Sequence, residues 1–88
     1  MSRILVALTD LGVGEAGTID HIRLPSTDQQ FLMRMGFVPG ARVRFSRRAP
    51  LGDPSVYSVD GTEIALRAEA ANCILVQRDC LSRSGELP

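Results

Sequence analysis

The strongest structural constraint in the sequence is the Asp60-Gly61 pair, which lies between two runs that alternate apolar and polar residues. An Asp-Gly pair favours a two-residue hairpin turn, in which both central residues take positive φ angles. The resulting partners are Val59 with Thr62, Tyr57 with Ile64, and Ser55 with Leu66. These residues then share one largely apolar face, and a slip of one position would mix the two faces. The segment therefore predicts a β-hairpin with a fixed register.

Other short runs predict further strands. The apolar residues 4–8 favour a first strand, and residues 16–23 favour a second with an irregularity near Asp20-His21. Residues 41–48 alternate, with Val43 and Phe45 on one face and Arg42, Arg44 and Ser46 on the other. Before this strand, Pro39-Gly40 suits a type II turn. Residues 68–72 predict a short helical turn, and residues 73–78 predict the closing strand.

One segment, over about residues 26–35, has a helical pattern. Ser26 is expected at the N-cap, where Gln29 would complete a capping box. The spacing of Phe31, Leu32 and Met35 predicts a shared core face, whereas Met33 points away from it. Gly36 follows as the expected left-handed residue that ends the helix.

These elements predict a mainly β fold, a small closed or partly closed barrel of five to six short antiparallel strands with one short inserted helix. The 88 residues correspond to one domain. We assign this domain to residues 1–78 and predict that residues 79–88 form a polar, flexible C-terminal tail.

Few side chains in the sequence are suited to catalysis or metal binding. His21 is the single histidine, and no nucleophile or carboxylate pair stands beside it, so we do not expect an enzyme or a bound cofactor. Cys73 and Cys80 match no zinc-ligand spacing; we expect a core thiol and an incidental one, and a surface His21. Two cysteines and a short N-terminal apolar run favour a reduced, cytoplasmic setting without membrane insertion.

Four arginines gather on one predicted strand and its exit: Arg42, Arg44, Arg47 and Arg48. They form either a solvated strand face or a surface for an anionic partner, protein or RNA. Phe45 alternates to the other face and cannot stack bases beside them, and the formal net charge is zero. If the four arginines bind a partner, a protein is therefore the better candidate, and no nucleic-acid partner is expected.

Three stretches carry a resemblance to a known family: residues 35–40 (MGFVPG), residues 49–54 (APLGDP), and residues 64–76, with Ile64-Ala65-Leu66-Arg67 and Ile74-Leu75-Val76. Their order and spacing, which hold from about Leu8 to Val76, resemble the FeoA family, small cytoplasmic accessory proteins of bacterial ferrous iron uptake. The resemblance implies an SH3-like barrel with a helical insertion. It also implies a partner, the cytoplasmic GTPase region of the membrane ferrous iron transporter FeoB, and it supplies no catalytic residues.

The leading hypothesis is thus a non-catalytic module that docks on FeoB and modulates transport through a preformed surface. The candidate partner-binding residues are Met33, Arg34, Arg42, Arg44, Arg47, Arg48, Leu51 and Asp53. Two alternatives stay open. One is a small ferrous iron sensor or chaperone that uses His21, Cys73, Cys80 and acidic residues, and the other is an RNA-associated barrel that uses the Arg42–Arg48 face. Weak homo-oligomers are also compatible with the exposed edges of short strands.

Overall fold

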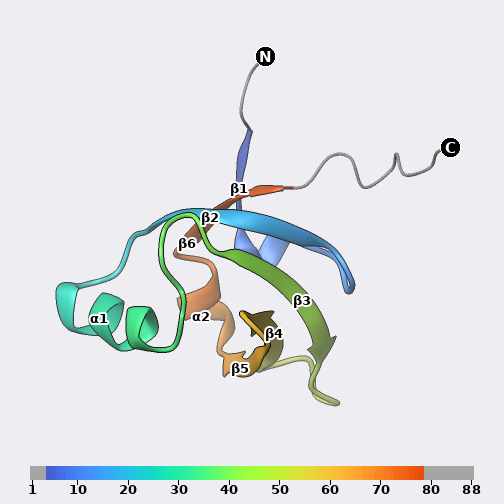
Figure 1. The fold of residues 1–88 in the computed structure, drawn as a ribbon. Helices are drawn as coiled ribbons and strands as arrows, with labels where there is room; N and C mark the ends of the chain where they lie inside the picture. The colour runs from blue at the N-terminus through green and yellow to red at the C-terminus, as the bar shows by residue number, and fades with distance from the viewer. Residues whose placement is uncertain (1–3, 79–88) are drawn as a thin grey trace, which may run out of the picture.

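The structure is a computed structural model and describes residues 4–78 (Figure 1). Its six strands form one antiparallel sheet in the order β1-β6-β2-β3-β4-β5. The strands are β1 (Leu5–Ala7), β2 (Ala16–Ile22), β3 (Arg42–Arg48), β4 (Ser55–Val59), β5 (Thr62–Leu66) and β6 (Ile74–Arg78). Helix α1 (Ser26–Arg34) lies between β2 and β3, a 3-10 turn η1 (Leu8–Asp10) follows β1, and α2 (Ala68–Ala71) precedes β6. The predicted mainly β fold with one inserted helix is confirmed; the predicted tail and Cys80 lie outside the described residues.

The β4–β5 hairpin has the predicted register. Val59 pairs with Thr62, Tyr57 with Ile64, and Ser55 with Leu66. Asp60 and Gly61 take φ angles of 54° and 80°, as a two-residue turn of this type requires. The inward residues are buried except Thr62, which is exposed beside the turn. The Asp60-Gly61 turn signal and the alternating pattern were therefore together sufficient to place this hairpin.

Two irregularities bend the sheet. The pairing of β2 with β6 shifts between Ile19 and His21, as predicted, and the pairing of β3 with β4 shifts between Phe45 and Arg47. Bulges of this kind increase strand twist and curl a sheet toward a barrel. The edge strands β1 and β5 are not paired with each other, so the barrel is partly open. At one edge, Leu5 of β1 lies opposite Gln77 of β6.

The end of α1 is a Schellman motif. The Gly36 N–H donates to the Met33 carbonyl (3.1 Å), and the Phe37 N–H donates to the Leu32 carbonyl (3.0 Å). Gly36 has a φ of 105°, and a Cβ at this position would approach Val59 to 3.1 Å. Phe37 and Leu32 are both buried in the core, which supplies the apolar contact of the motif. Gly36 therefore ends the helix as predicted and turns the chain into the core.

The predicted start and core face of α1 need correction. Pro25 is the N-cap residue, and because its side chain has no acceptor, it makes no capping hydrogen bond. Gln29 Nε2 donates to the Leu24 carbonyl (2.8 Å), so the predicted capping box with Ser26 is not formed. Leu32 is buried, but Phe31 and Met35 remain 58% and 38% exposed. A helix that contacts a small barrel along one narrow line buries one row of side chains, and here that row contains only Leu32.

No helix within residues 4–78 is long and apolar enough to span a membrane.

The predicted turn before β3 is present. Gly40 has a φ of 93°, and the Ala41 N–H donates to the Val38 carbonyl (3.0 Å).

The core is centred on the Phe45 and Tyr57 rings, whose centroids are 5.1 Å apart. Burial raises the pKa of the Tyr57 phenol, which a hydrogen bond from Ser55 opposes only in part.

Tyr57 gives a predicted pH dependence. Its folded pKa lies above the unfolded value of about 10, so the folded state retains the phenolic proton when the unfolded chain loses it. The contribution of Tyr57 to the free energy of unfolding is therefore fully present below about pH 10 and is lost as the pH rises through the folded pKa. Tyr57 is the single tyrosine, so phenolate absorbance titrates this group alone. We expect an alkaline shift of the titration on folding, and a Tyr57→Phe variant whose unfolding midpoint falls less steeply with alkaline pH.

Candidate functional site

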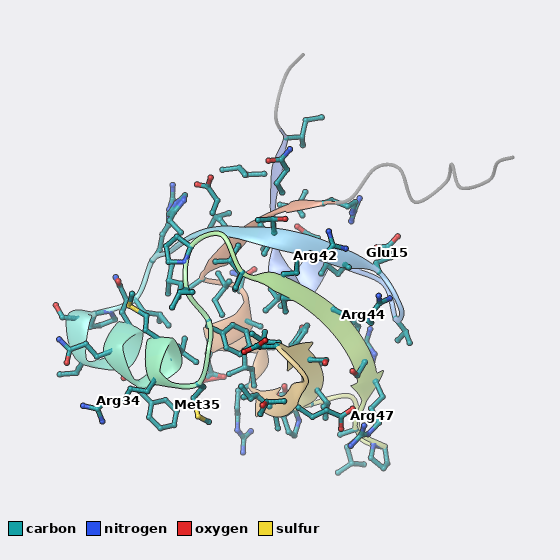
Figure 2. All side chains as sticks on the ribbon, in the orientation of Figure 1. Glu15, Arg34, Met35, Arg42, Arg44 and Arg47 are labelled. Atoms are coloured by element: carbon teal, nitrogen blue, oxygen red, sulfur yellow. The ribbon has the colours of Figure 1, made fainter. Side chains whose placement is uncertain are left out.

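The β3 bulge decides which arginines share a face. Arg44 lies opposite Ser58 and Arg47 opposite Val56, and both partners belong to the outer row of β4. Ser46 is the extra residue of the bulge. In a regular strand Arg47 would point inward like Phe45, two residues earlier, but the bulge turns it outward. Arg42 lies two residues before Arg44 and shares its face. Arg42, Arg44 and Arg47 thus form one outward row, which we call the arginine face (Figure 2).

Backbone and side-chain contacts position this face. Arg44 Nη1 donates to the Gly14 carbonyl (2.9 Å), and Arg47 Nη1 donates to Glu63 Oε1 (2.8 Å). Both partners of the Arg47–Glu63 pair are about half exposed, so the pair contributes only about 0.2–1 kcal/mol to stability. A polar hollow of about 170 Å³ lies beside Arg42 and Arg44. The guanidinium groups are therefore held on a rigid strand yet remain accessible.

Arg48 does not belong to the arginine face, contrary to the sequence-based grouping of four arginines. It lies opposite Ser55, in the inner row. Its Cζ atom is 5.0 Å from the centroid of the Phe45 ring, a cation–π contact. The bulge at Ser46 causes this difference, because one extra residue moves every later side chain to the other face. We therefore assign Arg48 a packing contact at the end of the core.

The loop between β3 and β4 holds the next two candidates. Its backbone is ordered by hydrogen bonds from the Gly52 N–H to the Ala49 carbonyl (2.8 Å) and from the Ala49 N–H to the Pro54 carbonyl (3.1 Å). Leu51 is 94% exposed at its tip. Asp53 Oδ1 accepts the Ala68 N–H (2.9 Å), one of the backbone donors at the start of α2 that have no partner within the helix, and so caps α2. Asp53 thus has a structural role that the sequence did not reveal.

Met33 and Arg34 lie apart from the other candidates. Both are exposed near the end of α1, and Met33 is 42% exposed, as its place off the core row predicted. Figure 2 shows Arg34 on the far side of the molecule from Arg44 and Arg47. Apart from Arg48, the predicted site residues therefore fall into three separate places, namely the arginine face, the β3–β4 loop and the end of α1.

The side chains with metal-binding chemistry make local contacts. His21 Nδ1 is 2.7 Å from Asp20 Oδ2, and Arg23 Nε donates to His21 Nε2 (3.4 Å). Cys73 is only half-buried rather than a core thiol, and its Sγ donates to the Glu69 carbonyl (3.5 Å). Among the residues that the structure describes, no three His, Cys, Asp or Glu side chains are grouped to hold a metal ion.

Sequence reasoning missed one concave feature, a groove between α1 and α2. Its volume is about 300 Å³, and its lining is mainly apolar. The lining residues are Leu24, Asp28, Phe31, Leu32, Leu66, Glu69 and Ala70. They come from the loop before α1, from α1, from the end of β5 and from α2, so no local pattern marks them. The exposed phenylalanine of α1 was the one available signal, and the periodicity wrongly assigned it to the core.

Comparison with known proteins identifies the class of domain to which this barrel belongs. A partly open barrel of short antiparallel strands is shared with the zinc-complexed FeoA of Stenotrophomonas maltophilia, described as a prokaryotic SH3 domain protein (28% identity, 88% of this chain and 93% of that chain, TM-score 0.71). The fold is therefore that of a small SH3-like domain. The FeoA domain model matches residues 6–78, and the chain belongs to this family.

Two further solved structures support the assignment. The FeoA protein of Chlorobium tepidum is 29% identical, with a TM-score of 0.79 over 83% of this chain and 70% of that chain. Iron(II) transport protein A of Clostridium thermocellum is 33% identical, with a TM-score of 0.78 over 83% of this chain and 45% of that chain. No curated protein gives a significant match. The family resemblance inferred over about Leu8 to Val76 is thus confirmed.

Proposed function

We propose that this protein is a non-catalytic accessory protein of ferrous iron uptake, which docks on the cytoplasmic GTPase region of the transporter FeoB and modulates transport. Membership of the FeoA family supports the pathway. The S. maltophilia relative has been proposed as a ferrous iron transport activating factor, which agrees with an accessory role. The observation that carries the docking proposal is the arginine face, a row of exposed cations on the rigid strand β3.

A surface of this kind suits reversible docking on a protein. Its side chains stand on a paired strand, and the adjoining loop is held by its own backbone hydrogen bonds, so little ordering is needed on binding. Cations on one face also accelerate encounter with an acidic partner surface. Arg42, Arg44 and Arg47 are therefore the proposed contacts, with Leu51 as an exposed apolar neighbour at the loop tip.

The test is binding of the purified full-length protein to the FeoB GTPase region, without nucleotide, with GDP, and with a GTP analogue. We expect saturable binding whose affinity falls as the salt concentration rises, because the contacts are between exposed charges. An unrelated GTPase of similar net charge serves as the control. Absence of binding in every nucleotide state would overturn the proposal.

A further inference from the structure

The groove between α1 and α2 has the size and lining of a docking site. Its volume of about 300 Å³ is about twice that of a cavity that holds one benzene ring, so it accommodates about two large apolar side chains. Leu32 and Leu66 are buried and form its floor, while Leu24 and Ala70 are half-buried beside them. The α1–α2 groove is thus an apolar depression with a fixed base.

Phe31 forms an exposed wall of this groove. Its side chain is 58% exposed, although Phe37, only six residues later, is completely buried. Met35, the C-cap residue four positions after Phe31, lies on the same side of the helix and is 38% exposed. Contiguous exposed apolar side chains beside a depression are typical of protein interaction sites. Phe31 in particular is placed to cover an inserted side chain.

Charge on the rim identifies the chemistry of the occupant. Asp28 of α1 and Glu69 of α2 are both exposed lining residues. Within residues 4–78 neither carboxylate forms an ion pair, and the neighbouring Arg67 is directed to Asp53 instead (3.7 Å). The rim is therefore acidic, whereas the cations of the arginine face lie along β3, away from α1 (Figure 2). An acidic rim disfavours anionic lipid and nucleic acid and favours a cationic partner.

We propose that the α1–α2 groove binds a short basic amphipathic segment of a partner protein. Two neighbouring apolar side chains of the segment fill the groove against Leu66 and Phe31, and Lys or Arg residues on either flank pair with Asp28 and Glu69. This is the helix-in-groove mode of recognition, with charges setting specificity around an apolar anchor. The proposal does not depend on docking through the arginine face, which would take an acidic partner.

The test uses the full-length protein and a model peptide of about fourteen residues, helical, with leucines at i, i+3, i+4 and i+7 and lysines on the flanks. Amide chemical shifts report where it binds. We expect saturable shifts centred on Leu24, Phe31, Leu66 and Ala70. Phe31→Ala should weaken binding at least about fivefold. The double variant Asp28→Asn/Glu69→Gln should weaken binding about as much and should flatten its salt dependence.

Matched controls separate the groove from a general apolar effect. Met33→Ala removes an exposed apolar side chain from the same helix outside the groove lining and should leave the affinity unchanged. A peptide with glutamate for lysine, and one with alanine for leucine, should each bind much more weakly. Equal binding of the glutamate peptide, or shifts centred away from the groove, would overturn the proposal. A peptide-free dimer that Phe31→Ala dissociates would also overturn it, since a second copy would then occupy the groove.

Discussion

Replacement of Phe37 by alanine is expected to lower the free energy of unfolding by about 3–5 kcal/mol. The ring is completely buried and anchors the Schellman motif that ends α1. Its removal leaves a cavity in a small core and also frees the turn that leads into β3. The measurement is urea-induced unfolding followed by circular dichroism, with the change taken from the transition midpoint at constant slope.

Phe31→Ala is the matched control for this prediction. It is the same substitution, but the Phe31 ring is 58% exposed, so we expect a loss below about 1 kcal/mol. If Phe37→Ala does not fold, Phe37→Leu retains most of the volume and should cost less than about 1.5 kcal/mol. Equal losses for Phe31→Ala and Phe37→Ala would contradict the assignment of Phe37 to the core and Phe31 to the surface.

The second large effect concerns binding. The double reversal Arg42→Glu/Arg44→Glu changes the charge of the arginine face by four units, and we expect it to weaken association with the FeoB GTPase region at least about tenfold at low salt. Most of this loss should appear in the association rate, because exposed charges act mainly by steering the encounter. Surface-based kinetics at two or three salt concentrations measure both the rates and the salt dependence.

Arg23→Glu provides a control of the same chemistry at another place. Arg23 is exposed and follows the end of β2 that pairs with β6, so its reversal should change the affinity by less than about twofold. Circular dichroism of the double variant checks that loss of the Arg44 contact with the Gly14 carbonyl leaves the fold intact. An unchanged association rate in the double variant would show that docking uses a different surface.

Much of the fold could be predicted because local patterns determine it. The Asp60-Gly61 turn, the Pro39-Gly40 turn and the Gly36 helix end each depend on a few adjacent residues with strong φ preferences. Apolar alternation then settled which faces of β3 and β4 are buried. The FeoA resemblance predicted the SH3-like class, which the comparisons confirm.

The remaining features depend on contacts between distant segments. The bulge at Ser46 has no marker in the alternating run, yet it separates Arg48 from the arginine face. Asp53 caps α2 from fifteen residues away. The exposure of Phe31 is a consequence of how little of α1 the barrel covers, which helical periodicity cannot report. For the same reason the α1–α2 groove, assembled from four segments, could be found only in three dimensions.

The pairing of Leu5 with Gln77 has a further consequence. Because β1 and β6 run antiparallel at the sheet edge, the polypeptide enters and leaves the domain at the same corner. Adjacent ends allow a domain to be spliced into a longer chain without stretching either junction. A domain with this geometry can be inserted into a longer chain as one unit, and two junctions placed next to Leu5 and Gln77 would both lie on the side of the domain away from α1 (Figure 1).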